Sequence, residues 1–160
     1  MPLTPFHLGP ALFVGMVFFR YVNLPSFLAA NVIVDLEPFF VLLFGLDYPL
    51  HGFFHSFLGG SLVALALFFV MWKMNAPVQK VMGVFGLRQD TDVRSIGIGC
   101  FLGVYFHILL DCFLYMDIMP FYPSEFNPVY GWFSGHEVYL FCVVSFVLGV
   151  LAYGYKTLNR

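Results

Sequence analysis

Two short stretches of the sequence place possible metal ligands four residues apart. "HGFFHS" contains His51 and His55, and "HILLD" contains His107 and Asp111. Residues i and i+4 share one face of a helix, so each pair can direct two side chains toward one ion. Mixed imidazole and carboxylate ligands suit zinc, and also manganese or iron. The two pairs therefore predict a metal site.

Further ionisable residues lie in or beside other apolar stretches. A single histidine at a helix end is more often a capping or interfacial residue, which is the simpler interpretation of His51 or His136 taken alone. Acids in a lipid environment need compensating partners, and these apolar stretches offer no Lys or Arg, which favours metal ligation over hydrogen-bonded packing. The expected ligands are His7, Asp35, His51, His55, His107, Asp111 and His136.

The composition is that of a membrane protein. Of the 160 residues, 61% are hydrophobic and 10% are charged, and the mean hydropathy is +0.87. A soluble domain carries about 25% charged residues, so this chain has too few polar side chains to cover a soluble surface. We expect one all-α, polytopic transmembrane domain over residues 1–160. The net charge of −2 gives a nucleic-acid partner no electrostatic support, and the three cysteines form no CxxC motif.

Five apolar segments predict about five membrane helices, since a span needs about 20 mostly apolar residues. They cover approximately residues 6–21, 27–46, 51–72, 96–116 and 136–155. The second contains Glu37 followed by Pro38, which lacks an N–H donor and restricts the residue before it. We therefore expect this span to be kinked or broken at Glu37–Pro38, with nearby polar groups facing protein or a water-filled cavity.

The positive charges predict the orientation. Five alternating spans place every Lys and Arg on one side: Arg20, Lys73, Lys80, Arg88, Arg94, Lys156 and Arg160. The positive-inside rule makes that side cytoplasmic, so a multi-pass inner or plasma membrane protein with its N-terminus outside and C-terminus inside is expected. The linker near 74–95 would be interfacial and the aromatic loop near 117–135 external. The histidines then fall in the outer half, which predicts a pocket facing the outer leaflet.

Four sequence blocks resemble a known family. "MPLTPFHLG", "NVIVDLEP", "HGFFHS" and "HILLD" are similar, in this order, to blocks of the small YdjM-like inner-membrane proteins, a family of membrane-bound metal-dependent hydrolases. The resemblance spans most of the chain, although His51 and His136 match it less closely. It implies a functional set of His7, Asp35, Glu37, His55, His107 and Asp111. The spacing of the pairs is also similar to that in zinc-dependent phospholipase C and related nucleases, as an analogy of spacing alone.

These patterns favour a metal-dependent hydrolase. One to three divalent ions, with zinc expected first, would lower the pKa of water toward roughly 7, and two ions about 3.5 to 4 Å apart would stabilise attacking and leaving oxygens. Asp35 is the expected bridging carboxylate. Glu37 is a ligand, a hydrogen-bond acceptor for a ligand or a general base, and His51 binds metal or assists the substrate. The expected substrate is a phosphoester of a membrane lipid or lipid-linked molecule, with an ester or amide as further options.

Two other functions compete with hydrolysis. A metal transporter or metal-binding membrane protein could use the same ligands. However, the inner stretches "LVALALFFV" and "VVSFVLGVL" contain no ionisable residues that would continue a cation pathway across the membrane. A packing scaffold with a buried polar network is the third interpretation. Gly59, Gly60, Gly97, Gly99 and Gly103 allow close helix approach under all three.

Overall fold

The computed structural model describes residues 6–159, which form helices, turns and loops with no β-strand. The elements are α1 (Leu8–Val17), α2 (Leu24–Ile33), α3 (Leu36–Phe44), the 3-10 turn η1 (Phe53–His55), α4 (Phe57–Lys73), α5 (Asn75–Val84), α6 (Val93–Cys112) and α7 (Gly135–Leu158). This confirms the all-α fold class. Arg160 lies outside the described residues.

The prediction of five membrane spans is not confirmed. Among the described residues, three helical stretches are long and apolar enough to cross a membrane: Leu24–Phe44, which joins α2 and α3, together with α6 and α7. The pair α4 and α5, bent by 75°, makes a fourth if it is counted as one span. Helix α1 has ten residues, or about 15 Å at the usual rise, which is half of a hydrocarbon core about 30 Å thick. The first apolar run in the sequence therefore overstates the helix within it.

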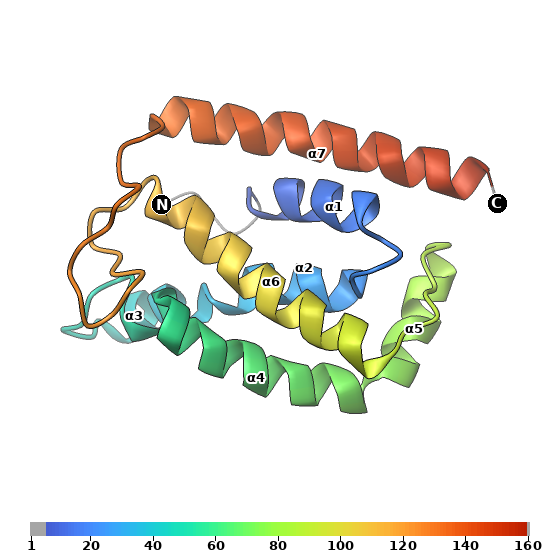
Figure 1. Cartoon of the computed structure of the whole chain (residues 1–160), viewed down its shortest axis with the longest axis horizontal. Coiled ribbons are helices and arrows are strands. Elements are labelled where there is room, and N and C mark those ends of the chain that lie inside the picture. Colours follow the sequence, from blue (N-terminus) through green and yellow to red (C-terminus); the bar gives the residue numbers. More distant parts are fainter. Residues whose placement is uncertain (1–5, 160) are drawn as a thin grey trace.

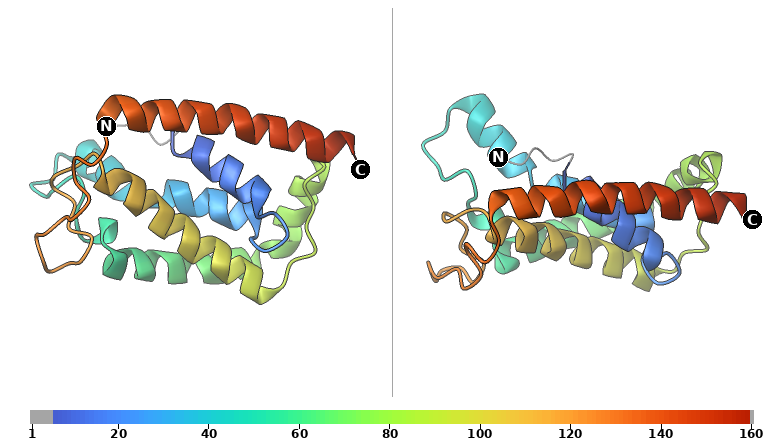
Figure 2. Two further views of the ribbon diagram at one scale, coloured as in Figure 1. Left: turned by 45° about the horizontal axis from the view of Figure 1, so that its top comes forward. Right: turned by 90° about the horizontal axis from the view of Figure 1, so that it is seen from above.

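The long helices run side by side and reverse direction at two ends of the molecule (Figure 1). Helix α6 packs against α2 and α4, while α1 packs against α7 and α2. One end holds α3, η1 and the loop over residues 113–134, and the other end holds α5 (Figure 2). The Lys and Arg residues among residues 6–159 belong to elements at the α5 end or to the turns there, such as Arg20 after α1 and Lys73 at the end of α4. Which end is cytoplasmic stays a prediction.

The broken span is present, but the break lies at Val34–Asp35 and not at Glu37–Pro38. Pro38 sits in the first turn of α3, where its missing N–H removes no intrahelical hydrogen bond. The chain therefore re-enters a helix before the proline. Asp35 occupies the N-cap position of α3, yet its side chain makes no capping hydrogen bond, so its carboxylate is directed elsewhere.

The predicted helix that starts at His51 is also wrong in its first residues. His55 ends η1, and α4 begins two residues later because the Ser56 hydroxyl accepts a hydrogen bond from the Gly59 amide at 2.9 Å. His51 precedes the 3-10 turn and lies outside any helix. The two histidines therefore do not share an α-helical face, although their rings meet edge to face with centroids 5.0 Å apart.

Close packing of α2 on α6 depends on small residues. A Cβ atom added to Gly103 would lie 2.4 Å from the Ala30 Cβ and 2.7 Å from the Phe27 carbonyl oxygen. These distances are shorter than real contacts, so a larger residue at 103 must move backbone. In contrast, a Cβ at Gly154 of α7 meets nothing within 4 Å.

We expect Gly103→Ala to lower the free energy of unfolding by about 1 to 3 kcal/mol, as overpacking does in other cores. Gly154→Ala is the matched control, and it should leave stability unchanged or raise it slightly through helix propensity. Equilibrium unfolding in detergent would measure both. Equal stability of the two variants would show that the α2–α6 approach is not this tight.

Candidate metal centre

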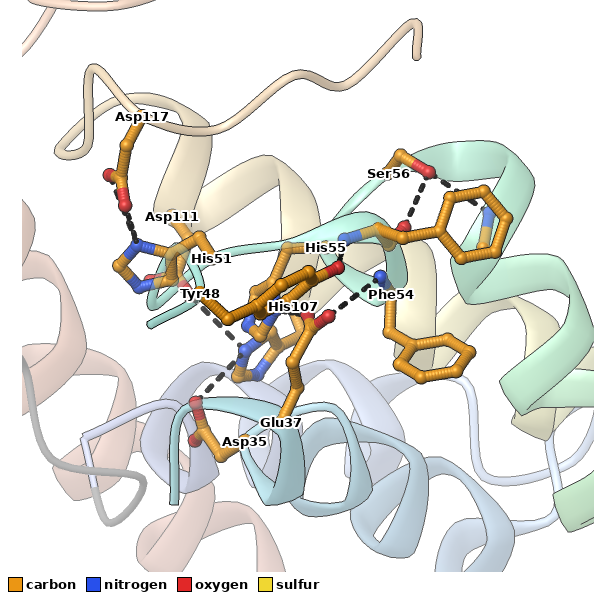
Figure 3. Close-up of polar contacts among 12 residues, drawn as sticks. Asp35, Glu37, Tyr48, His51, Phe54, His55, Ser56, His107, Asp111 and Asp117 are labelled. Carbon is orange, nitrogen blue, oxygen red and sulfur yellow. Dashed lines mark hydrogen bonds and ion pairs between the residues drawn. The ribbon is translucent and has the colours of Figure 1, made fainter. Parts of the chain in front are cut away.

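Four of the predicted ligands converge at one end of the helices (Figure 3). Asp35, His55, His107 and Asp111 each offer one ligand atom, and these atoms all lie within 4.8 Å of one another. We call these four residues the metal group. Asp35 comes from the break between α2 and α3, His55 from η1, and the other two from α6. The i, i+4 spacing predicted for His107 and Asp111 is thus realised on a regular helix.

The distances from His107 to the two carboxylates of the metal group fit coordination of a shared ion. The His107 Nε2 atom lies 3.1 Å from Asp111 Oδ2 and 3.4 Å from Asp35 Oδ1. With metal–ligand bonds of about 2.0 to 2.2 Å, atoms at these separations subtend about 90 to 115° at the ion. Tetrahedral and octahedral coordination both fall in this range. The donor set of two imidazoles and two carboxylates suits a divalent cation of the zinc, manganese or iron type.

Hydrogen bonds fix both imidazoles of the metal group in the form that binds metal. The His107 Nδ1–H donates to the backbone carbonyl oxygen of Asn31 at 2.8 Å, and the His55 Nδ1–H donates to Glu37 Oε2 at 2.7 Å. Each Nε2 then carries a lone pair. Both Nε2 atoms are buried and have no hydrogen-bond partner among the described residues. Because buried polar atoms in proteins are normally satisfied, these two orphaned nitrogens fit a metal ion.

Glu37 serves His55 in this structure. Its Oε2 accepts from the imidazole, and its Oε1 accepts from the Phe54 amide at 3.2 Å. The carboxylate is therefore held between η1 and α3, with both oxygens engaged. Of the three roles that the sequence leaves open, this geometry matches that of a hydrogen-bond acceptor which orients a ligand.

His7 lies beside the metal group without belonging to it. Its Nε2 atom is 3.1 Å from Asp111 Oδ1, and its ring lies over that of His107 with centroids 4.4 Å apart. The residue is buried, with 2% of its surface exposed. His7, at the start of α1, is therefore a fifth predicted ligand in this region, and it lies next to Asp111 Oδ1, whereas His107 lies next to Oδ2.

His51 lies next to His55 and is held by a residue that the sequence did not single out. Its Nδ1 atom lies 3.0 and 3.1 Å from the two carboxylate oxygens of Asp117. Its ring also packs on Tyr115, with centroids 4.2 Å apart. Burial raises the pKa of the Tyr115 phenol, so this hydroxyl stays protonated. Asp117 and Tyr115 lie in the aromatic loop, where no periodic spacing connects them to His51, so pattern reasoning alone could not find them.

His136 is the one predicted ligand that the structure leaves apart from the others. It is exposed in the first turn of α7. Ser134 and Glu137 form a capping box around it, which explains the polar character of this stretch as a helix start. The geometry thus gives no support to a ligand role for His136.

Comparison of the chain with protein-family models, curated proteins and solved structures finds no match. The resemblance to YdjM-like proteins therefore stays a prediction.

Removing the carboxylate that orients His55 should weaken metal binding. We expect Glu37→Ala to lower the affinity for zinc by about 10- to 100-fold, the usual effect of removing a hydrogen-bond partner of a metal-bound histidine. His136→Ala is the control and should bind as the wild type does. Competition with a chromogenic chelator measures both affinities. Unchanged affinity in Glu37→Ala would contradict the role assigned to this residue.

Proposed function

We propose that this chain is a membrane-embedded, metal-dependent hydrolase whose site opens toward the outer leaflet. The observation that carries the proposal is the convergence of two pre-oriented imidazoles with two carboxylates at the metal group. A divalent cation bound there, with zinc the expected ion, supplies a Lewis acid and a water of lowered pKa. Two carboxylates balance the charge of such a cation, as neutral imidazole ligands cannot.

The burial of the four side chains supports an approach route for water and substrate. The side chains of His55 and His107 are 0% exposed and that of Asp111 is 2% exposed, whereas that of Asp35 is 15% exposed. The metal group is therefore enclosed on the α6 side and reached from the break between α2 and α3. We propose that a substrate oxygen reaches the metal group beside Asp35.

An apolar cavity beside this break supports a lipid substrate. It measures about 380 Å³, and Glu37, the acceptor for His55, lies in its wall. The other lining residues are mainly aliphatic and aromatic, among them Ile33, Phe40 and Val63. A hydrocarbon chain in this cavity would place its polar linkage near the metal group. The volume of this cavity and its apolar lining are typical of pockets that bind small molecules.

A phosphoester is the bond that this arrangement favours. The Lys and Arg residues that the structure describes belong to elements at the α5 end, so the cation itself would hold an anionic phosphate. Metal-assisted displacement at phosphorus needs such charge neutralisation at the attacking and leaving oxygens. The proposed substrate is therefore a phospholipid or a lipid-linked phosphoester.

A metal transporter is the alternative function, and the path beyond the metal group bears on it. Helix α2 carries Asn31, Ser26 and Asn23 toward the α5 end, all of them buried. These side chains are polar but not ionisable, and Ser26 hydrogen bonds to Asn23 within the same helix turn. Cation pathways across membranes are marked by intramembrane ionisable residues. This difference supports hydrolysis over transport.

Activity should depend on metal and on the metal group. Protein purified in detergent should contain bound metal, hydrolyse a phospholipid or lipid-phosphate substrate, lose activity on chelation and regain it with zinc. His107→Ala should lose at least 100-fold in activity, since losing a ligand should cost at least as much as the 10- to 100-fold lost with a ligand's hydrogen-bond partner. Folded wild type that holds no metal under chelator-free conditions would overturn the proposal. Metal flux in proteoliposomes that depends on Asp35, without hydrolysis, would replace it with transport.

Filling the apolar cavity should affect long-chain substrates selectively. We expect Val63→Trp to raise KM for a long-chain substrate about tenfold, while a water-soluble short-chain analogue is cleaved at the wild-type rate. Val150→Trp, at an exposed position of α7, is the matched control for bulk. Equal effects on the long and short substrates would show that the chain does not occupy this cavity.

A further inference from the structure

The carboxylate of Asp111 faces two histidines, one with each oxygen. Its Oδ1 atom is 3.1 Å from His7 Nε2, and its Oδ2 atom is 3.1 Å from His107 Nε2. The side chains of all three residues are at most 2% exposed. They come from the start of α1 and the last two turns of α6. This arrangement shares His107 and Asp111 with the metal group and adds His7 to them.

Hydrogen bonds leave part of this arrangement unsatisfied. Asp111 Oδ1 and His107 Nε2 are both buried, and neither has a hydrogen-bond partner within the part of the chain that the structure describes. A separation of about 3.1 Å between a nitrogen and an oxygen atom is also that of neighbouring ligands on one ion.

A single ion cannot bind His7 together with all four residues of the metal group. His7 is not among the residues whose ligand atoms lie within 4.8 Å of one another. Two ligands of one ion with bonds of about 2.2 Å can be separated by no more than about 4.4 Å. His7 therefore lies outside the reach of an ion in the metal group, and it faces Asp111 Oδ1 where His107 faces Oδ2.

We infer that Asp111 bridges two divalent cations, and that His7 binds the second one. The first ion lies in the metal group and contacts Oδ2, while the second contacts Oδ1 and His7 Nε2. This inference rests on the metal centre of the proposed function, and it moves the bridging role from Asp35 to Asp111. A bridging carboxylate holds two ions about 3.5 to 4 Å apart, the spacing found in two-metal hydrolases.

The two sites differ in strength. The first ion has four protein ligands, whereas His7 and Asp111 are the protein ligands that the geometry offers to the second. The imidazole of His7 is placed by its stack on His107, and its Nδ1 atom is buried without a hydrogen-bond partner among residues 6–159. The remaining positions of the second ion are open to water or to a substrate oxygen. The second ion is thus the weaker and more readily exchanged one.

Metal counting on the full chain tests this inference. Detergent-purified protein, stripped with a chelator and dialysed against micromolar zinc, should hold two ions per chain by mass spectrometry. His7→Ala should hold one, with the affinity of the tighter site changed less than threefold. His136→Ala should hold two. Two ions in His7→Ala, or one ion in the wild type, would overturn the inference.

A second measurement covers the case in which His7→Ala fails to fold. X-ray absorption spectroscopy of the zinc-loaded wild type should show metal–metal scattering at about 3.5 to 4 Å, and its absence would equally overturn the inference. The outcomes separate the two proposals. One bound ion with intact hydrolysis removes the second site and leaves the hydrolase. Two bound ions without hydrolysis of any lipid phosphoester leave the two-ion site and remove the hydrolase.

Discussion

The burial of acidic side chains among apolar helices is the constraint on which this structure depends. Asp111 is almost fully enclosed, and an ionised carboxylate in such surroundings is strongly disfavoured unless it is paired. Its neighbours are two imidazoles, which as neutral groups cannot balance a charge. The Lys and Arg residues that could do so belong to the α5 end. A divalent cation at the metal group would resolve this conflict, because it would bind both carboxylates and both orphaned imidazole nitrogens at once.

The local features of the fold serve this convergence. The helix is interrupted at Val34–Asp35, between α2 and α3. The Asp35 side chain is therefore not restricted to the direction that a continuous helix would give it. The glycines of α6 let α2 approach until the Asn31 carbonyl reaches His107. The Ser56 cap starts α4 late and leaves η1 to present His55. Each of these three features interrupts or modifies a regular membrane helix, and each positions one residue of the metal group or the partner that orients it.

Residue types and their helical spacing predict much of the fold and of the metal group. Where these predictions are wrong, the reason is physical. The all-α class follows from composition, and the His107–Asp111 pair follows from the period of the helix that contains it. The pair His51 and His55 was expected on one helix, but the cap formed by Ser56 outweighs the apolar pattern there. The sequence predicts the break at Pro38, because proline lacks an N–H donor, but hydropathy does not show that a new helix begins at Leu36, where Pro38 falls in the first turn and is tolerated. Helix length was overestimated for the first segment, since hydropathy does not distinguish a helix from an apolar loop.

The contacts that the sequence did not predict are those made between elements distant in the chain. Asp117 approaches His51 from a loop 66 residues away, and the partner of His107 is a backbone carbonyl, which has no signature in residue type. His136 shows the converse, because its residue type suits a ligand but its place at a capped helix start keeps it apart. Ligand identity was therefore predictable where a helix carries two ligands, and the orienting groups were not.

Anomalous X-ray scattering from crystals of metal-replete protein tests the central claim most directly. Data collected on both sides of the zinc absorption edge should show a peak about 2.0 to 2.2 Å from the Nε2 atoms of His55 and His107 and from carboxylate oxygens of Asp35 and Asp111. A folded, metal-replete crystal with no peak among these four residues, or with its metal bound elsewhere, would contradict the account.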